Sequence, residues 1–186
     1  YDGEIKIRYA RQDGIGKGDA MRKGYALAKN DILMILDADL TVAPEALPKF
    51  YNALVSGKGN FINGSRLVYP MDNDAMRFLN LIANSAFARL FSWLLNQDIT
   101  DTLCGTKVLS RAHYDLISAN RHYFGDFDPF GDFDLIFGAA KQHLRIVDIP
   151  IRYAGRSYGE TQISRFRHGV LLIRMVFFAY RKLAAI

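Results

Sequence analysis

One short segment constrains the fold more than any other part of the chain. The apolar run Ile32 to Leu36 ends in the acidic sequence Asp37-Ala38-Asp39 and a turn. A continuous apolar run of this length, bounded by polar residues, is typical of a strand that is buried on both faces. Such strands occur in α/β domains, where helices cover the sheet. The segment therefore predicts a buried central strand with two carboxylates at its carboxyl end.

The segments around this strand alternate between helical and extended patterns. We expect helices over residues 19–29, 44–55, 76–95, 111–117 and 132–142, and strands over residues 61–63, 106–109 and 145–153. Pro44 suits the first turn of its helix, and Pro150 suits a strand near the edge of a sheet. Because no repeat or linker divides the chain, we expect residues 1–186 to form a single α/β domain.

Charge and cysteine content exclude some classes of protein. The formal charge of +5 suits phosphate-rich ligands and anionic membrane surfaces equally well. The basic residues are dispersed and no helix-turn-helix, zinc-finger or RNA-recognition pattern is present, so we expect no nucleic-acid partner. Cys104 is the single cysteine, which excludes an intrachain disulfide and favours a packed thiol in a cytoplasmic protein.

Two pairs of carboxylates carry the chemistry that the sequence indicates. Asp37 and Asp39 can converge on Mg or Mn beyond the end of the strand, where α/β sheets bind ligands. Such an ion bridges the oxygens of a nucleoside diphosphate. The same pattern occurs in solvated loops, so its position after a buried strand is what favours a metal site. Asp132 and Asp134 begin a helix, where they either act in catalysis or only complement the helix dipole.

Several motifs, taken in order, resemble glycosyltransferase family 2, within it the branch of dolichyl-phosphate mannosyltransferases and other polyprenyl-phosphate sugar transferases. The matching stretches are Gly16-Lys17-Gly18, Ile35 to Leu40 with Pro44-Glu45, Gly64-Ser65-Arg66, Asp101 to Lys107, Gly131 to Leu135, Ile149 to Tyr153 and Arg156 to Thr161. The resemblance covers nearly the whole chain. It implies the GT-A fold of nucleotide-diphospho-sugar transferases, which is Rossmann-like, with a mixed sheet flanked by helices.

The chain departs from this family's pattern at two places. The family's first strand has no counterpart before the lysine–glycine segment, so we expect a glycosyltransferase domain that lacks its N-terminal part. Gln162 stands where the lipid-phosphate branch usually has lysine. Arg156 or Arg165 is the expected replacement for that positive charge.

The resemblance also implies a role for each candidate site residue. Asp39 is implied as the more direct metal ligand, and Asp37 as a contact of the metal or the ribose. The nucleotide diphosphate is expected to contact Lys17, Gly18, Asp37, Ala38 and Asp39. Because guanidinium groups match phosphate oxygens, the acceptor is expected to contact Arg66, Arg77, Arg156, Gln162 and Arg165, with Arg66 preferred. Apart from Arg66, these arginines can equally be solvated surface residues.

The expected activity is metal-dependent transfer of a sugar, with inversion, from a UDP- or GDP-linked donor to a polyprenyl phosphate. A lipid phosphate needs no general base, whereas a glycan hydroxyl would need Asp132 or, second, Asp134. Three alternatives stay open: transfer to a glycan hydroxyl, a nucleotidyltransferase on a similar fold, and a fragment that binds a nucleotide sugar or a partner without turnover.

Membrane contact is a separate question. No apolar run of about 18 uncharged residues is present to span a bilayer. Residues 76–95 and 170–186 are apolar with scattered arginines, which is typical of helices that lie on a membrane and is explained equally by core packing. We expect a cytoplasmic protein, with the cytosolic face of the membrane as its place of contact. Residues 125–130 are either an acceptor loop or a structured turn.

Overall fold

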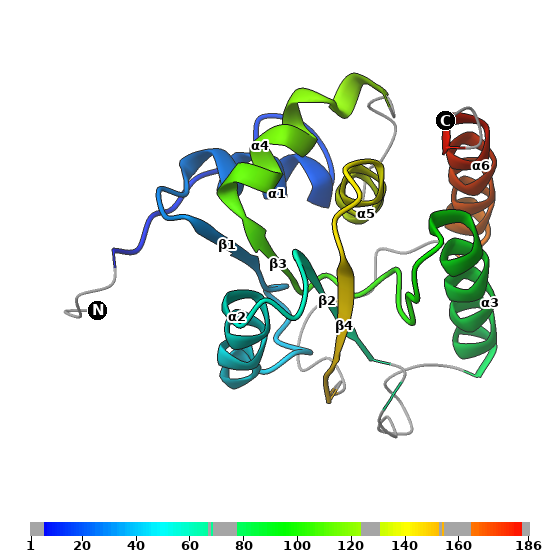
Figure 1. Ribbon diagram of the computed structural model, residues 1–186, viewed down its shortest axis with the longest axis horizontal. Coiled ribbons are helices and arrows are strands. Elements are labelled where there is room, and N and C mark those ends of the chain that lie inside the picture. The colour runs from blue at the N-terminus through cyan, green and yellow to red at the C-terminus, as the bar shows by residue number, and fades with distance from the viewer. Residues whose placement is uncertain are drawn as a thin grey trace.

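The computed structural model describes residues 6–66, 68, 78–123, 131–152, 154 and 165–183. Its elements are α1 (Lys17–Leu27), β1 (Ile32–Ile35), the 3-10 turn η1 (Pro44–Ala46), α2 (Leu47–Val55), β2 (Phe61–Ser65), α3 (Phe78–Leu95), β3 (Lys107–Ser110), α4 (Arg111–Ala119), the 3-10 turn η2 (Arg121–Tyr123), α5 (Asp132–Lys141), β4 (Ile146–Pro150) and α6 (Arg165–Leu183). Every helix and strand expected from the sequence is present close to its predicted place (Figure 1). Residues 125–130 lie outside the described part.

The four described strands form one mixed sheet in the order β1-β3-β2-β4. β3 is antiparallel to β1 and to β2, whereas β2 and β4 are parallel. Lys107 at the start of β3 lies opposite Ile35 at the end of β1 and opposite Asn63 in β2. The segments that follow β1 and β2 therefore meet the segment that leads into β3 at one edge of the sheet.

The position of β1 corrects one prediction. β1 lies at an end of the described sheet and not in its centre, since β3 is its one partner among the described strands. Leu33 is also the one fully buried residue in β1. An apolar run indicates how the two faces of a strand pack and carries no information on how many strands pair with its edges. Pro150 ends β4 at the other end of the sheet, where a proline was expected.

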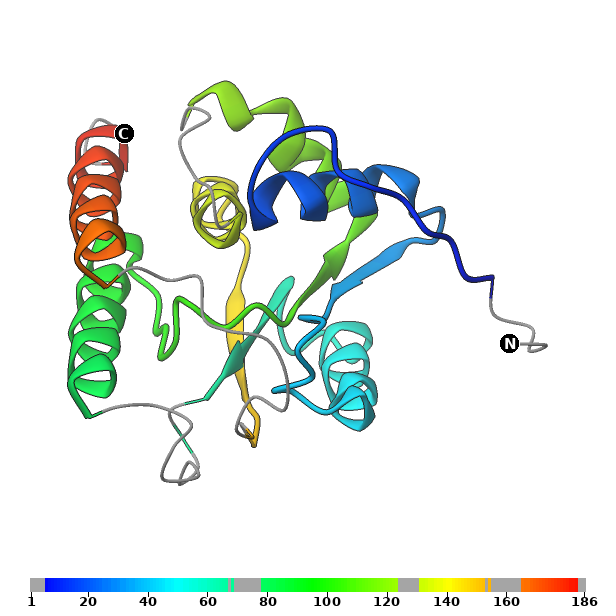
Figure 2. The same cartoon turned by 180° about the vertical axis from the view of Figure 1, so that it is seen from behind.

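Helices cover both faces of the sheet. α2 packs on one face, and α1, α4 and α5 lie on the other, with α3 and α6 beyond α5 (Figures 1 and 2). Successive strand residues point to opposite faces, so Leu109 packs toward α5 and Val108 toward α2. Burying a side chain of this size contributes about 1.5–3 kcal/mol relative to leaving it exposed.

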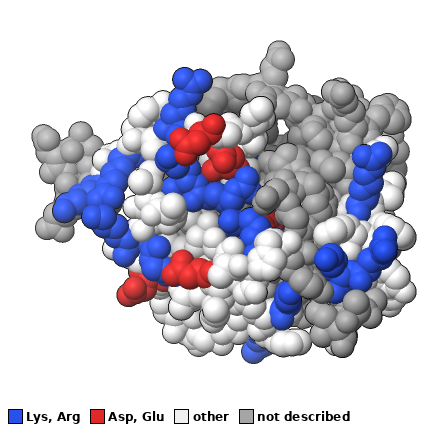
Figure 3. Space-filling view, turned by 90° about the horizontal axis from the view of Figure 1, so that it is seen from above, with Lys and Arg blue, Asp and Glu red and all other residues white. Residues whose placement is uncertain are grey.

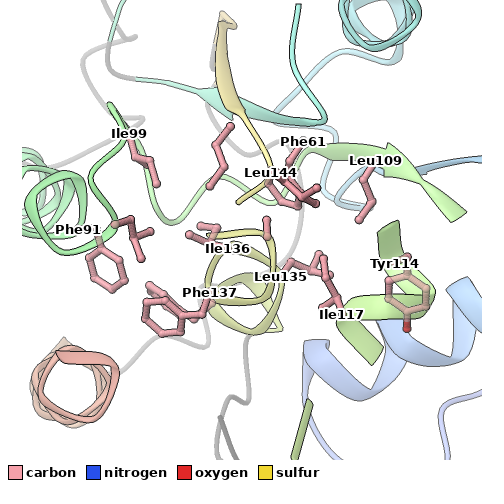
Figure 4. Close-up of a cluster of buried hydrophobic side chains, with 14 of the residues drawn as sticks. Phe61, Phe91, Ile99, Leu109, Tyr114, Ile117, Leu135, Ile136, Phe137 and Leu144 are labelled. Atoms are coloured by element: carbon pink, nitrogen blue, oxygen red, sulfur yellow. The ribbon is translucent and has the colours of Figure 1, made fainter. Parts of the chain in front are cut away.

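α5 lies at the centre of the larger core. Figure 4 shows aromatic and aliphatic side chains from β2, β3, α3 and α4 gathered around it. The first eight residues of α5, Asp132 to Ala139, are all buried. A helix that is surrounded on all sides in this way carries its polar residues into the interior as well. The two carboxylates in its first turn, Asp132 and Asp134, must therefore find partners inside the protein.

Candidate active site

Two aspartates and two lysines of alternating charge meet at the edge of the sheet where β1 ends and β3 begins. Lys17 Nζ lies 2.9 Å from Asp37 Oδ1 and 3.4 Å from Asp132 Oδ2. Lys107 Nζ lies 2.8 Å from Asp132 Oδ1. We call Asp37, Lys17, Asp132 and Lys107 the carboxylate–lysine cluster. It brings together residues that are far apart in the sequence and that come from α1, β3, α5 and the end of β1.

The local chain geometry explains why these side chains converge. Leu33 packs toward α5, and because side chains alternate along a strand, Lys107 points to the same face as Leu109. Gly131 precedes α5 with a φ of 75°, and a Cβ on it would lie 2.7 Å from Gly18 Cα. The starts of α1 and α5 can approach each other because both residues are glycines. That close approach places Lys17 beside Asp132.

The inner half of the cluster is closed to solvent. The side chains of Lys107 and Asp132 are almost completely buried, and Lys107 also donates a hydrogen bond to the Cys104 carbonyl oxygen. Buried charges of this kind are tolerated only when they are paired. Lys107 therefore holds the Asp132 carboxylate from its buried side through Oδ1, and Asp132 Oδ2 is directed toward Lys17.

The outer half of the cluster is open. The Asp37 side chain is 36% exposed, and Lys17 is exposed to a similar degree. Burial acts to lower the pKa of Lys17, but the charges of Asp132 and Asp37 outweigh it and raise the pKa above its ordinary value. Lys17 is consequently a cation at neutral pH. Its ammonium group lies where a bound cation would contact the Asp37 carboxylate.

Asp37 and Asp39 supply oxygen ligands of the kind that Mg and Mn prefer. Asp39 is half-buried, and its Oδ1 accepts hydrogen bonds from the Thr41 amide at 3.2 Å and the Thr41 hydroxyl at 2.9 Å. Within the described ranges, no three His, Cys, Asp or Glu side chains are grouped closely enough to hold a metal ion. A Mg ion bound by one or two carboxylates and by substrate phosphates requires no such group. These residues therefore fit an ion that binds together with a diphosphate.

Gly105 forms the wall of the cluster, in the loop that leads into β3. A Cβ on Gly105 would lie 2.6 Å from Asp37 Cγ and closer still to Asp37 Oδ2 and Lys17 Nζ. Sequence reasoning gave neither Gly105 nor Lys107 a role in the site. A lysine two residues before Leu109, on the buried face of a strand, was the signal that could have identified Lys107.

Asp101 anchors the same loop at its other end. Its buried carboxylate accepts hydrogen bonds from Arg66 Nε at 2.6 Å, Arg66 Nη2 at 2.8 Å and the Leu103 amide at 3.0 Å. Burial acts to raise the pKa of Asp101, but its hydrogen bonds to Arg66 and the Arg66 charge hold the pKa below its ordinary value. Arg66 is thus engaged inside the fold through Nε and Nη2 of its guanidinium group, and its contact with an acceptor phosphate stays a prediction.

The remaining candidates lie elsewhere. Asp134 points away from the cluster and pairs with Arg121 Nε at 2.6 Å, in the wall of a cavity of about 230 Å³ between α4 and α5. Cys104 is buried, which raises the pKa of its thiol to about 11, as expected for a packed thiol. Arg77, Arg156 and Gln162 lie outside the described residues, as does the side chain of Arg165. Gly18 is buried against Gly131, and Ala38 is exposed in the turn between the two aspartates.

Comparison with known proteins identifies the family. Residues 1–117 match the family model described as "Glycosyl transferase family 2". The chain belongs to this family. It is therefore a glycosyltransferase domain, as the motifs predicted.

Three curated proteins resemble the chain at modest identity. It is 24% identical over 159 residues to "Glycosyltransferase AglD" of Haloferax volcanii, covering 86% of this chain and 24% of that protein. It is 28% identical over 170 residues to the "Dolichyl-phosphate hexose transferase" of the same organism, covering 91% and 70%. The identity to the "Undecaprenyl-phosphate mannosyltransferase" of Micrococcus luteus is 26% over 164 residues, covering 82% and 62%. The chain thus spans between about a quarter and 70% of these relatives.

A solved structure of glucosyl-3-phosphoglycerate synthase from Mycobacterium tuberculosis resembles the fold. That protein was determined in complex with Mn2+, UDP and glucosyl-3-phosphoglycerate. The TM-score is 0.60 at 17% identity, and the match covers 97% of this chain and 57% of that one. The likeness establishes the GT-A fold, with its mixed sheet flanked by helices.

Proposed function

We propose that this domain transfers a sugar from a nucleoside diphosphate sugar to a polyprenyl phosphate, with the help of Mg or Mn. The observation that carries the proposal is the carboxylate–lysine cluster, which places Asp37, Lys17 and Asp132 together at the carboxyl end of β1. A site with both an accessible carboxylate and an ammonium group suits a metal–diphosphate pair, because the carboxylate can bind the metal ion and the ammonium group can bind the diphosphate.

The donor would lie over the outer half of the cluster. A Mg or Mn ion held by Asp37 and Asp39 would neutralise charge that develops on the leaving diphosphate. Lys17 is the protein's own cation at the same place, and its three donors can turn from Asp37 to a phosphate oxygen. The Thr41 hydrogen bonds fix one oxygen of Asp39 and so orient the turn that carries both aspartates.

In the proposed step, an oxygen of the acceptor attacks C1 of the sugar from the face opposite the diphosphate. The bond between C1 and the diphosphate oxygen breaks, and its electron pair leaves with the nucleoside diphosphate. A lipid phosphate enters as an oxyanion, so no proton has to be removed. Two relatives are named as transferases of dolichyl phosphate and of undecaprenyl phosphate, and these names support this acceptor class.

The environment of Asp132 supports a second candidate, transfer to a glycan hydroxyl. A general base needs one oxygen within hydrogen-bond reach of the acceptor. Asp132 Oδ1 is bound to Lys107, whereas Oδ2 is bound to Lys17 at the longer distance of 3.4 Å. Movement of Lys17 onto the diphosphate would release Oδ2 to accept a proton from a hydroxyl. Because Asp134 pairs with Arg121, we favour Asp132 alone for this role.

The first test is calorimetric titration of UDP and GDP, with and without Mn, against the chain and an Asp39→Ala variant. We expect Mn-dependent binding of one nucleotide that is lost in the variant. With the corresponding nucleotide sugar as donor, release of the nucleoside diphosphate when a polyprenyl phosphate is added, but not when a glycan is added, would then support the proposed acceptor. Binding without turnover on either acceptor would contradict catalysis by this chain and favour a nucleotide-sugar binding fragment. Pyrophosphate formation from a nucleoside triphosphate and a sugar phosphate would indicate a nucleotidyltransferase.

A further inference from the structure

α3 presents an apolar stripe to solvent. The exposed residues Ile82, Ala86, Leu90 and Trp93 recur at intervals of three or four positions and so share one face of the helix, with Arg89 among them. The opposite face packs into the core through Ala88, Phe91 and Leu95. Trp93 is 67% exposed. Packing against the protein interior therefore does not account for the outer stripe.

α6 repeats this arrangement. Val170, Ile173, Phe177 and Tyr180 are exposed on one face, and Phe177 is 63% exposed. Met175 and Ala179 are buried on the other face. Among the exposed residues lie Arg174 and Arg181, and the Arg181 guanidinium carbon is 6.0 Å from the centre of the Phe177 ring.

The two stripes form one surface. α3 and α6 contact each other, and both lie on the far side of α5 from α1 in Figures 1 and 2. Trp93 of α3 stacks on Tyr180 of α6, with ring centres 5.9 Å apart and the ring planes inclined by 14°. We call the exposed residues of the two helices the α3/α6 surface. Two large aromatic side chains thus join the stripes at a place where both remain in contact with solvent.

The charge of this surface has one sign. The sequences of α3 and α6 contain no acidic residue, and the charged side chains that the structure describes on them are Arg89, Arg174, Arg181 and Lys182. The two helix sequences hold six arginines and lysines in all, whereas the whole chain has a formal charge of +5, so the rest of the chain is close to neutral. Figure 3 shows blue basic side chains at the right-hand side, where α3 and α6 lie in Figure 1.

We propose that the α3/α6 surface docks on a bilayer of anionic phospholipid. Contiguous exposed apolar patches mark interaction sites. Tryptophan and tyrosine favour the boundary between water and lipid, and arginine can keep its charge at the headgroups while its stem lies on apolar surface. A second copy of the chain is a poorer occupant, because pairing two such surfaces would bring like charges together, whereas anionic headgroups neutralise them. No helix in the described ranges is long and apolar enough to cross a membrane.

Trp93 makes a direct test possible, because it is the only tryptophan in the chain. Its fluorescence is measured on addition of phosphatidylcholine vesicles with and without phosphatidylglycerol, and with brominated acyl chains in a parallel series. We expect a blue shift and quenching by the brominated lipid with the anionic vesicles, and a weaker response without phosphatidylglycerol or at high salt.

Matched variants locate the binding. Phe177→Glu should reduce partitioning onto anionic vesicles at least about tenfold, because it removes an exposed aromatic side chain that would be buried in the lipid and adds a negative charge that anionic headgroups repel. Leu116→Glu is the control, since Leu116 is 53% exposed on α4, away from this surface. Equal loss in both variants, no response to anionic vesicles, or a blue shift caused by self-association alone would overturn the proposal. Nucleotide binding is measured on the same samples, so failure here is distinguishable from failure of the proposed sugar transfer.

Discussion

Gly105→Ala tests whether the geometry of the carboxylate–lysine cluster matters for ligand binding. The added Cβ would lie 2.6 Å from Asp37 Cγ, whereas real Cβ atoms essentially never approach another heavy atom within 3.0 Å. The contacts with Asp37 Oδ2 and Lys17 Nζ would be tighter still, so both side chains must move. A misplacement of about 1 Å at a reacting centre can lower activity about a hundredfold.

We therefore expect Gly105→Ala to weaken Mn-dependent nucleotide binding and sugar transfer by about ten- to a hundredfold. Calorimetry measures the affinity, and circular dichroism with thermal unfolding shows whether the fold is retained. Gly24→Ala is the matched control, because Gly24 lies in α1 and a Cβ there meets no atom within 4 Å. This control should keep its affinity and gain up to about 1 kcal/mol of stability, since alanine favours a helix more than glycine does.

One result would refute this reasoning directly. If Gly105→Ala binds nucleotide and Mn as tightly as the unchanged chain while remaining folded, the diphosphate does not depend on the observed positions of Asp37 and Lys17. The site would then have to lie elsewhere on the sheet edge. A parallel loss in Gly24→Ala would instead show that α1 as a whole, and not the wall at Gly105, had been perturbed.

Three further predictions concern the buried charges. Arg66→Met should cost about 3–5 kcal/mol of stability in urea unfolding at pH 7, because it leaves the Asp101 charge unpaired in the interior; a loss below 1 kcal/mol would contradict this. The pKa of folded Asp101 lies below the ordinary value of 3.8, so the ionised carboxylate contributes fully to stability above pH 3.8 and this contribution is lost as the pH falls through the folded pKa. Urea midpoints measured from pH 6 downward should show this loss in the unchanged chain. The Arg66→Met variant should not show it. Lys107→Met should destabilise the chain by a similar amount, about 3–5 kcal/mol, and adding Asp132→Asn should recover part of it; no recovery would indicate that Lys107 acts through packing alone.

The sequence predicted those features of the fold that depend on local pattern. Helical and strand periodicity located the four described strands and the helices α1 to α5, and the apolar run before Asp37 correctly indicated the strand that leads to the site. It did not indicate that β1 lies at the end of the described sheet, because pairing partners come from distant segments. The pairing of Arg66 with Asp101 and of Asp134 with Arg121 likewise depends on contacts between elements, which spacing along the chain does not contain.

The charge balance of the cluster suggests how a ligand enters without a large electrostatic cost. Asp37, Lys17, Asp132 and Lys107 alternate in sign and sum to zero, so the buried part is neutral before any ligand binds. In the proposed function, a divalent ion that replaced Lys17 beside Asp37 would add positive charge, and the diphosphate would bind both that ion and the displaced ammonium group. Lys107 would keep Asp132 paired throughout, so that no uncompensated buried carboxylate would remain when Lys17 moved away. In this proposal, the buried Lys107 is what would allow the more exposed Lys17 to exchange partners.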